Sequence, residues 1–157
     1  MDLPYLEEFV RTWSDNANTR WIWVSLYTPQ VGEISTERLT RDDRARVIDD
    51  LRALRRRFPK LQMVDGLLNV YAKPPASPDA CIFAQTTECI SSDFEHRITP
   101  CQFGGTPDCA NCGCIASAGL EAIGRHRLWG FIPVGQIFSG SLRLGQEVRR
   151  ARRAAVW

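Results

Sequence analysis

The sequence predicts an α/β chain: two βα units come first, then a small cysteine-rich domain of β-hairpin and loop, then C-terminal helices. Two observations support this fold class. Within residues 4–72, apolar residues recur first at helical and then at strand spacing, and this pair of patterns occurs twice. All six cysteines lie between positions 81 and 114, whereas residues 1–80 contain none. We therefore divide the chain into residues 1–75, 76–118 and 119–157.

The composition is ordinary for a globular chain of 157 residues, with 44% hydrophobic residues and a net charge of +2. This near balance of charge gives no reason to expect a nucleic acid or an anionic membrane as partner. The first residues are acidic rather than basic, and no apolar stretch approaches the ~20 residues that a membrane span needs. We therefore expect a cytoplasmic protein without a membrane span. Structural disulfides are rare in that compartment.

The N-terminal part is predicted to form helix, strand, helix, strand. The helices cover residues 3–13 and 40–59, and the strands cover residues 20–29 and 61–72. The first strand is apolar at nearly every position, which is typical of strands buried on both faces of a parallel sheet. The second is interrupted at Gly66, where we expect a bulge. Helical crossovers between such strands are typical of parallel βα units, so we expect the end of a larger sheet or barrel.

The second predicted helix combines an apolar stripe with many charges. Thr40 is placed to cap its start, and Val47, Leu51 and Leu54 form the inner stripe. Seven arginines and four aspartates share the helix, which favours a solvated, salt-bridged face over an RNA-binding one.

The rest of the chain is predicted as linker, hairpin, loop and helices. Three prolines mark residues 72–79 as a linker, and residues 89–101 have the pattern of a β-hairpin. Helices are predicted over residues 115–127 and 133–154. The arginines that close the second of them favour a solvated basic terminus.

Four of the six cysteines lie within fourteen positions. Cys109 and Cys112 form a C-x-x-C pair, whose turn can direct both sulfurs at one metal ion or cluster. Two glycines, Gly104 and Gly105, let the chain preceding this pair turn tightly. Cys114 lies only two positions after Cys112, a spacing that suits two irons of a cluster better than one small ion.

The same residues leave other chemistries open. Zinc normally takes four ligands from two separated pairs, but the chain has one C-x-x-C, and His96 and His126 lack the spacing of zinc ligands. A redox-active C-x-x-C is expected at the start of a helix, without further cysteines nearby. The spacing therefore favours an iron–sulfur cluster and leaves zinc as the main alternative, followed by redox-active or inert thiols.

Four stretches together resemble a known family: "WVSLYTPQVGE", "FPKL", "CIFAQTTECISSDFEHRITPCQFGGTPDCANCGCIASAGL" and "GRHRL". They are similar to the C-terminal half of radical S-adenosylmethionine (radical SAM) proteins with a SPASM- or twitch-like cysteine domain. The resemblance covers residues 4–150 and is most specific over 99–120. It implies a partial radical-SAM-type barrel, followed by a β-hairpin domain that holds an auxiliary 4Fe–4S cluster.

The resemblance assigns the cysteines by position. Cys81 matches the family's cysteine before the hairpin, and Cys101 matches the one after it. Cys109 and Cys112 match the C-x-x-C that follows. Cys114 has no clean equivalent in the family, so Cys81 and Cys114 compete for the fourth ligand position.

Two further positions bear on the cluster. His96 stands where the family has a hairpin glycine, and this departure makes one auxiliary cluster a better fit than two. Cys89 falls on a strand of the hairpin and is expected to be a buried thiol rather than a ligand.

The family's catalytic motif is absent. The catalytic cluster needs C-x-x-x-C-x-x-C after the first barrel strand, and residues 1–80 have no cysteine. The resemblance therefore implies a C-terminal fragment or subunit, which needs an N-terminal radical SAM half from the same gene or another chain. Without that half, we expect no SAM cleavage.

Active sites of parallel barrels lie at the carboxyl ends of the strands. This rule makes Ser25, Tyr27 and Thr28 candidates for contact with SAM or substrate, with Glu33 in the loop beyond. Asp65 and Asn69 on the second strand are weaker candidates. Strand packing that ends in a proline turn would explain the same residues without a ligand.

Two functions remain open at this point. The first is the C-terminal part of a radical SAM enzyme, whose auxiliary cluster binds substrate or relays electrons. The second is a free-standing iron–sulfur or zinc module that transfers electrons or scaffolds a partner.

Overall fold

The computed structural model describes residues 3–154, and the chain is mixed α/β, as the sequence predicts. The described α-helices are α1 (Leu3–Asp15), α2 (Arg41–Arg57), α3 (Asp65–Ala72), α4 (Ile82–Thr86), α5 (Ile115–Arg125) and α6 (Val134–Ala154). The strands are β1 (Cys89–Ile90), β2 (Arg97–Ile98), β3 (Arg127–Leu128) and β4 (Ile132–Pro133). Two single-turn 3₁₀ helices are η1 (Pro78–Ala80) and η2 (Cys109–Asn111).

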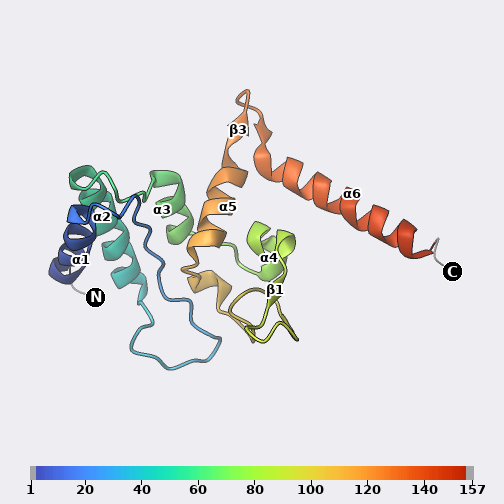
Figure 1. The fold of residues 1–157 in the computed structure, drawn as a ribbon, viewed down its shortest axis with the longest axis horizontal. Coiled ribbons are helices and arrows are strands. Elements are labelled where there is room, and N and C mark those ends of the chain that lie inside the picture. The colour runs from blue at the N-terminus through green and yellow to red at the C-terminus, as the bar shows by residue number, and fades with distance from the viewer. Residues whose placement is uncertain (1–2, 155–157) are drawn as a thin grey trace.

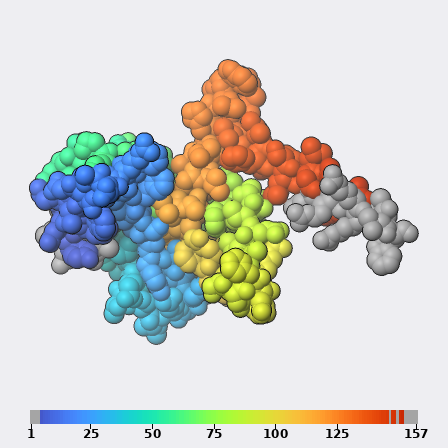
Figure 2. Space-filling model, in the orientation of Figure 1, coloured from blue at the N-terminus to red at the C-terminus, as the bar shows by residue number. Residues whose placement is uncertain are grey.

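The helices form a body from which one helix projects. Helices α1, α2 and α3 lie at one end of the molecule, and α5 runs between α3 and α4 (Figure 1). The β1–β2 hairpin lies beside α4, on the other side of α5 from the N-terminal helices. The cysteine-rich loop that follows it runs back to the extended segment 25–31 and to α2. Helix α6 leaves the body and extends away from it, as the space-filling view also shows (Figure 2).

The hydrophobic core lies between α1, α2, α3, α5 and the extended segment 20–31. Its most completely buried side chains are Val10, Leu51, Leu54, Leu61, Met63, Leu68, Val70 and Tyr71. Ala118 of α5 belongs to the same core. Each large aliphatic side chain buried in this way contributes about 1.5–3 kcal/mol to folding. The core therefore ties the N-terminal helices to the helix that directly follows the cysteines.

One pair of residues shows the parallel relationship expected for βα units. Ile22 and Leu61 form an isolated parallel bridge. In it the Ile22 amide donates to the Lys60 carbonyl at 2.8 Å and the Gln62 amide donates to the Ile22 carbonyl at 2.9 Å. Helix α2 connects the two segments, as a crossover does. The parallel pairing is confined to this bridge, because the chain after Ile22 pairs with the cysteine-rich loop instead.

The predicted second strand is wrong for most of its length, because residues 65–72 form helix α3. Leu67, Leu68 and Tyr71 lie three and four positions apart and bury one side of this helix. The short apolar run fits helix and strand equally well, and packing against α5 selects the helix. Gly66 is not at a bulge: a Cβ there would lie 3.7 Å from the Ala122 Cβ of α5.

The helix α2 and the hairpin agree with prediction. The Thr40 side chain caps α2 by accepting a hydrogen bond from the Asp43 amide at 3.1 Å. Strands β1 and β2 pair antiparallel, with Cys89 opposite Ile98. The short hairpin β3–β4 was not predicted. No helix of residues 3–154 has the length and apolar character needed to cross a bilayer.

Candidate metal centre

Five cysteines from separate parts of the chain line one cavity. They are Cys81, Cys101, Cys109, Cys112 and Cys114. The other walls are mainly apolar and include Pro75, Phe83 and Phe103. The cavity has a volume of about 20 Å³. Cys89 does not line this cavity; it lies on β1 and is half-buried rather than buried.

The cavity is built where the extended segment 25–31 lies against the cysteine-rich loop. The Leu26 amide donates to the Gly113 carbonyl at 2.9 Å, and the Val31 amide donates to the Thr106 carbonyl at 2.8 Å. Between them, the Asp108 amide donates to the Pro29 carbonyl at 2.8 Å. The prediction of a strand over residues 20–29, buried on both faces, is wrong: this segment is extended but makes only isolated bridges at Ile22 and Gln30, and Trp21 and Trp23 are exposed. Its backbone pairs with the cysteine-rich loop instead, and so it holds the loop that carries the C-x-x-C pair.

Glycine is required where these two segments cross. A Cβ on Gly113 would lie 2.2 Å from the carbonyl oxygen of Leu26, far inside any real contact. Gly104 and Gly105 have φ values of +61° and +56°, which only glycine adopts readily, and they turn the chain after Cys101 as predicted.

The three residues predicted to contact SAM or substrate have different neighbours. Thr28 lines the cavity; its hydroxyl donates to Cys112 Sγ at 3.8 Å and accepts from the Gly113 amide at 2.9 Å. Ser25 Oγ accepts from the Ile115 amide at 3.4 Å. Tyr27 instead donates to Glu33 in the adjoining loop, and this bond raises the pKa of Tyr27. Ser25 and Thr28 therefore support the cysteine-rich loop.

The two weaker candidates on the predicted second strand lie on α3 and bind arginines of α2. Asp65 accepts from Arg55 Nη2 at 2.7 Å. Asn69 accepts from Arg52 Nη2 at 3.1 Å. Both interactions join α3 to α2, and neither residue lines the cysteine cavity.

Hydrogen-bond donors point at two of the sulfurs. Cys112 Sγ accepts from the Cys114 amide at 3.5 Å. Cys114 Sγ accepts from the Ser117 amide at 3.4 Å and from Gln102 Nε2 at 3.0 Å. Such N–H···S bonds stabilise a thiolate and tune the potential of an iron–sulfur cluster. The sulfur of Cys81 has a hydroxyl neighbour instead, Ser117 Oγ at 3.2 Å.

Burial favours the protonated form of three of the cavity thiols. Desolvation raises the pKa values of Cys101, Cys109 and Cys114, and that of Cys109 reaches about 11. For Cys114 the hydrogen bond from the Ser117 amide opposes this shift. A metal binds the thiolate, so occupation of the cavity would release protons.

The two candidate metals need different spacings of their sulfur ligands. A tetrahedral zinc ion with Zn–S bonds of about 2.3 Å holds its sulfurs about 3.8 Å apart. Among the described residues, which include all six cysteines, no three sulfurs lie within 4.8 Å of one another. A 4Fe–4S cluster needs wider spacing, because each thiolate binds a different iron.

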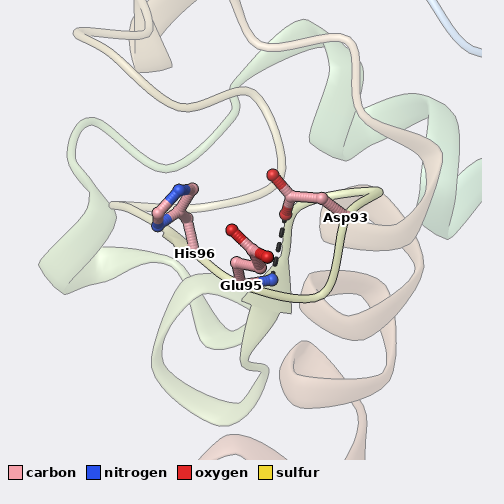
Figure 3. Close-up of side chains that lie close together, drawn as sticks. All are labelled: Asp93, Glu95 and His96. Atoms are coloured by element: carbon pink, nitrogen blue, oxygen red, sulfur yellow. Dashed lines mark hydrogen bonds between the residues drawn. The ribbon is translucent and has the colours of Figure 1, made fainter.

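A second group of potential ligands lies on the hairpin turn. Oxygen or nitrogen atoms of Asp93, Glu95 and His96 lie within 4.8 Å of one another (Figure 3). All three residues are exposed, and the turn itself explains their proximity. The Glu95 amide donates to Asp93 Oδ1 at 2.9 Å, and the His96 amide donates to Ser91 Oγ at 3.0 Å.

The sequence analysis missed one residue next to the cavity, Arg44. The charge pattern of α2 assigned its arginines to a solvated face, but Arg44 is only 7% exposed. Its guanidinium donates to backbone carbonyls of the C-x-x-C turn. The signal was present, because Arg44 precedes Val47 by three positions and Leu51 by seven and so falls on the apolar stripe.

Comparison with known proteins found no matching family model, no matching curated protein and no matching solved structure.

Proposed function

We propose that this chain binds a 4Fe–4S cluster through Cys101, Cys109, Cys112 and Cys114, with Cys81 as the competing fourth ligand. The observation that carries the proposal is the convergence of five thiols on one largely apolar cavity. Two of the proposed ligands accept N–H···S bonds. No three sulfurs among the described residues lie within 4.8 Å of one another, which supports a cluster over a single zinc ion.

A bound cluster would supply one-electron chemistry. The residues of this chain would control its exposure to water and its reduction potential. Phe83, Phe103 and the neighbouring prolines limit access of water to the cavity. The hydroxyl of Thr28 and the amides of Cys114 and Ser117 donate to sulfur. Solvent exposure and hydrogen bonds to sulfur are the main factors that tune such a potential.

We further propose that the chain acts as the C-terminal part of a radical SAM protein, with the cluster as the auxiliary one. The parallel bridge between Ile22 and Leu61 and the crossover helix α2 support a partial barrel. An apolar groove of about 600 Å³ lies beside this bridge. This groove supports the proposal that another domain or subunit packs there. Trp21 and Trp23, 59% and 58% exposed, line it. An N-terminal radical SAM half would cover such a groove with its own strands and helices.

The test is anaerobic purification of the full chain, followed by iron, sulfide and zinc assays and visible absorption. We expect about four irons and four sulfides per chain, as a 4Fe–4S cluster requires, and a brown protein. The Cys101→Ala and Cys112→Ala variants should lose the iron. Cys89→Ala is the matched control, because Cys89 does not line the cavity, and it should keep its iron. One zinc per chain in a colourless protein would contradict the proposal.

The absence of the catalytic cysteine motif makes a second prediction about the same chain. Calorimetry should show negligible SAM binding by this chain alone, because SAM binds the catalytic cluster of the proposed partner half. Micromolar SAM affinity of the isolated chain would contradict this part of the proposal.

A further inference from the structure

The guanidinium of Arg44 lies directly behind the C-x-x-C turn. Its Nη2 donates to the Asn111 carbonyl at 2.5 Å, and its Nη1 donates to the Cys112 carbonyl at 3.1 Å. Nη1 also donates to the Tyr71 carbonyl of α3 at 3.2 Å. One side chain of α2 therefore joins α3 to the turn that carries Cys109 and Cys112.

Arg44 carries a buried charge without a carboxylate partner. No ion pair among the described side chains involves it, and the nearby Asp108 pairs with Arg38 at 3.0 Å. Its Nε has no hydrogen-bond partner in the described part of the chain. Burial lowers the pKa of Arg44, but a guanidinium stays protonated in proteins. A buried, unpaired cation is costly unless an anion lies nearby.

Among the groups whose negative charge would act on Arg44, Cys112 of the cavity has the largest effect, ahead of Tyr71 and Asp108. A 4Fe–4S core of charge 2+ bound by four thiolates has a net charge of 2−. Taking up one electron from a reductant makes the core 1+ and the net charge 3−. A fixed cation close by therefore stabilises the reduced form more than the oxidised form.

We propose that Arg44 is the counter-charge and positioning residue of the cluster, so that its charge raises the reduction potential while its hydrogen bonds hold the C-x-x-C turn. This inference rests on the proposed iron–sulfur function. It extends that function from binding to control of the potential by a residue outside the cysteine-rich segment.

Four proteins test the proposal: wild type, Arg44→Met, Arg44→Lys and the control Arg46→Met. Lysine keeps the charge but cannot bridge the same carbonyls, whereas methionine removes the charge and leaves a side chain of similar length. Arg46 lies on the same helix with 73% of its side chain exposed, so its removal changes net charge equally but at a solvated position. Each protein is purified anaerobically, assayed for iron and sulfide, and titrated with dithionite in the presence of redox dyes.

At a fixed solution potential, we expect the ratio of oxidised to reduced cluster to be at least tenfold higher in Arg44→Met than in the wild type. This corresponds to a potential at least about 59 mV lower for one electron. Arg44→Lys and Arg46→Met should stay within a few-fold of wild type. If Arg44→Met takes up no cluster, a cluster of wild-type potential in Arg44→Lys also supports the role of the charge.

Three results overturn the inference. One is a wild-type potential in cluster-loaded Arg44→Met. Another is loss of the cluster from both Arg44→Met and Arg44→Lys, because the hydrogen bonds to the turn then matter and the counter-charge role is overturned. The third is the absence of iron from the wild-type protein, which overturns the proposed function as well. The wild type thus distinguishes failure of the function from failure of the inference.

Discussion

The hydroxyl of Thr28 accepts a hydrogen bond from the Gly113 amide at 2.9 Å, although 85 positions separate the two residues. The same hydroxyl donates to Cys112 Sγ at 3.8 Å. A residue of the first extended segment therefore fixes both the backbone and a sulfur of the cysteine-rich loop. The candidate metal centre is therefore formed by residues of the N-terminal part of the chain as well as by residues 76–118.

The Thr28→Val substitution should destabilise the protein and weaken its hold on metal. It keeps the side-chain shape but leaves the buried Gly113 amide without an acceptor, which costs about 1–3 kcal/mol. Urea unfolding followed by circular dichroism measures the change. Thr28→Ser keeps the hydroxyl and is the control; equal loss in both variants would show that packing, not the hydrogen bond, is responsible.

Gly113→Ala should disrupt the site more strongly. The new Cβ would lie 2.2 Å from the Leu26 carbonyl oxygen, so one of the two crossing backbones must move. We expect a loss of about 1–3 kcal/mol or more in the free energy of unfolding, and loss of iron from the purified protein.

Gly119→Ala is the matched control for this change. Gly119 lies inside α5, and a Cβ there meets nothing within 4 Å. Alanine in a helix interior is more favourable than glycine, so this variant should gain about 0.5–1 kcal/mol and keep its iron. Equal unfolding free energies for the two variants would contradict the close contact between the backbones of Leu26 and Gly113.

The fourth ligand can be identified by comparing Cys114→Ala with Cys81→Ala. Cys114 Sγ receives two N–H donors, whereas the contact of Cys81 Sγ is the hydroxyl of Ser117. We therefore expect iron content to fall by more than half in Cys114→Ala and to stay near wild type in Cys81→Ala. The reverse order in the iron and sulfide assays would assign the position to Cys81.

In the metal-free protein, the thiol of Cys109 should react unusually slowly with iodoacetamide. Because burial raises its pKa to about 11, the thiol is protonated at neutral pH, and its thiolate fraction rises about tenfold per pH unit up to that value. Iodoacetamide labelling of chelator-treated protein, with peptide mass spectrometry at pH 7 to 11, measures this profile.

The same labelling in guanidinium chloride supplies the control, because unfolding returns Cys109 to the ordinary pKa of a free cysteine, near 8.5. A labelling rate for Cys109 in the folded protein that levels off below pH 9 would contradict the buried environment.

Local patterns were enough to predict several elements. The apolar stripe and the Thr40 cap predicted α2, and the run between Cys89 and Cys101 predicted the hairpin. These features depend on residues close together in the chain. Residues 65–72 were assigned to a strand because a short apolar run satisfies either pattern. Contact with α5, some fifty positions further on, decides for the helix.

The order of amino acids alone determined which residues are chemically able to form a metal centre: the clustered cysteines, the C-x-x-C pair and the glycines that let the loop turn. Only the tertiary structure decided that five of the six thiols face one cavity and that Cys89 does not. It also decided that Thr28 and Arg44 adjoin them. The physical reason is that burial and hydrogen bonding between distant segments depend on packing, which no spacing along the chain records. A charge pattern assigns an arginine to solvent, whereas the packed body places Arg44 behind the cysteines.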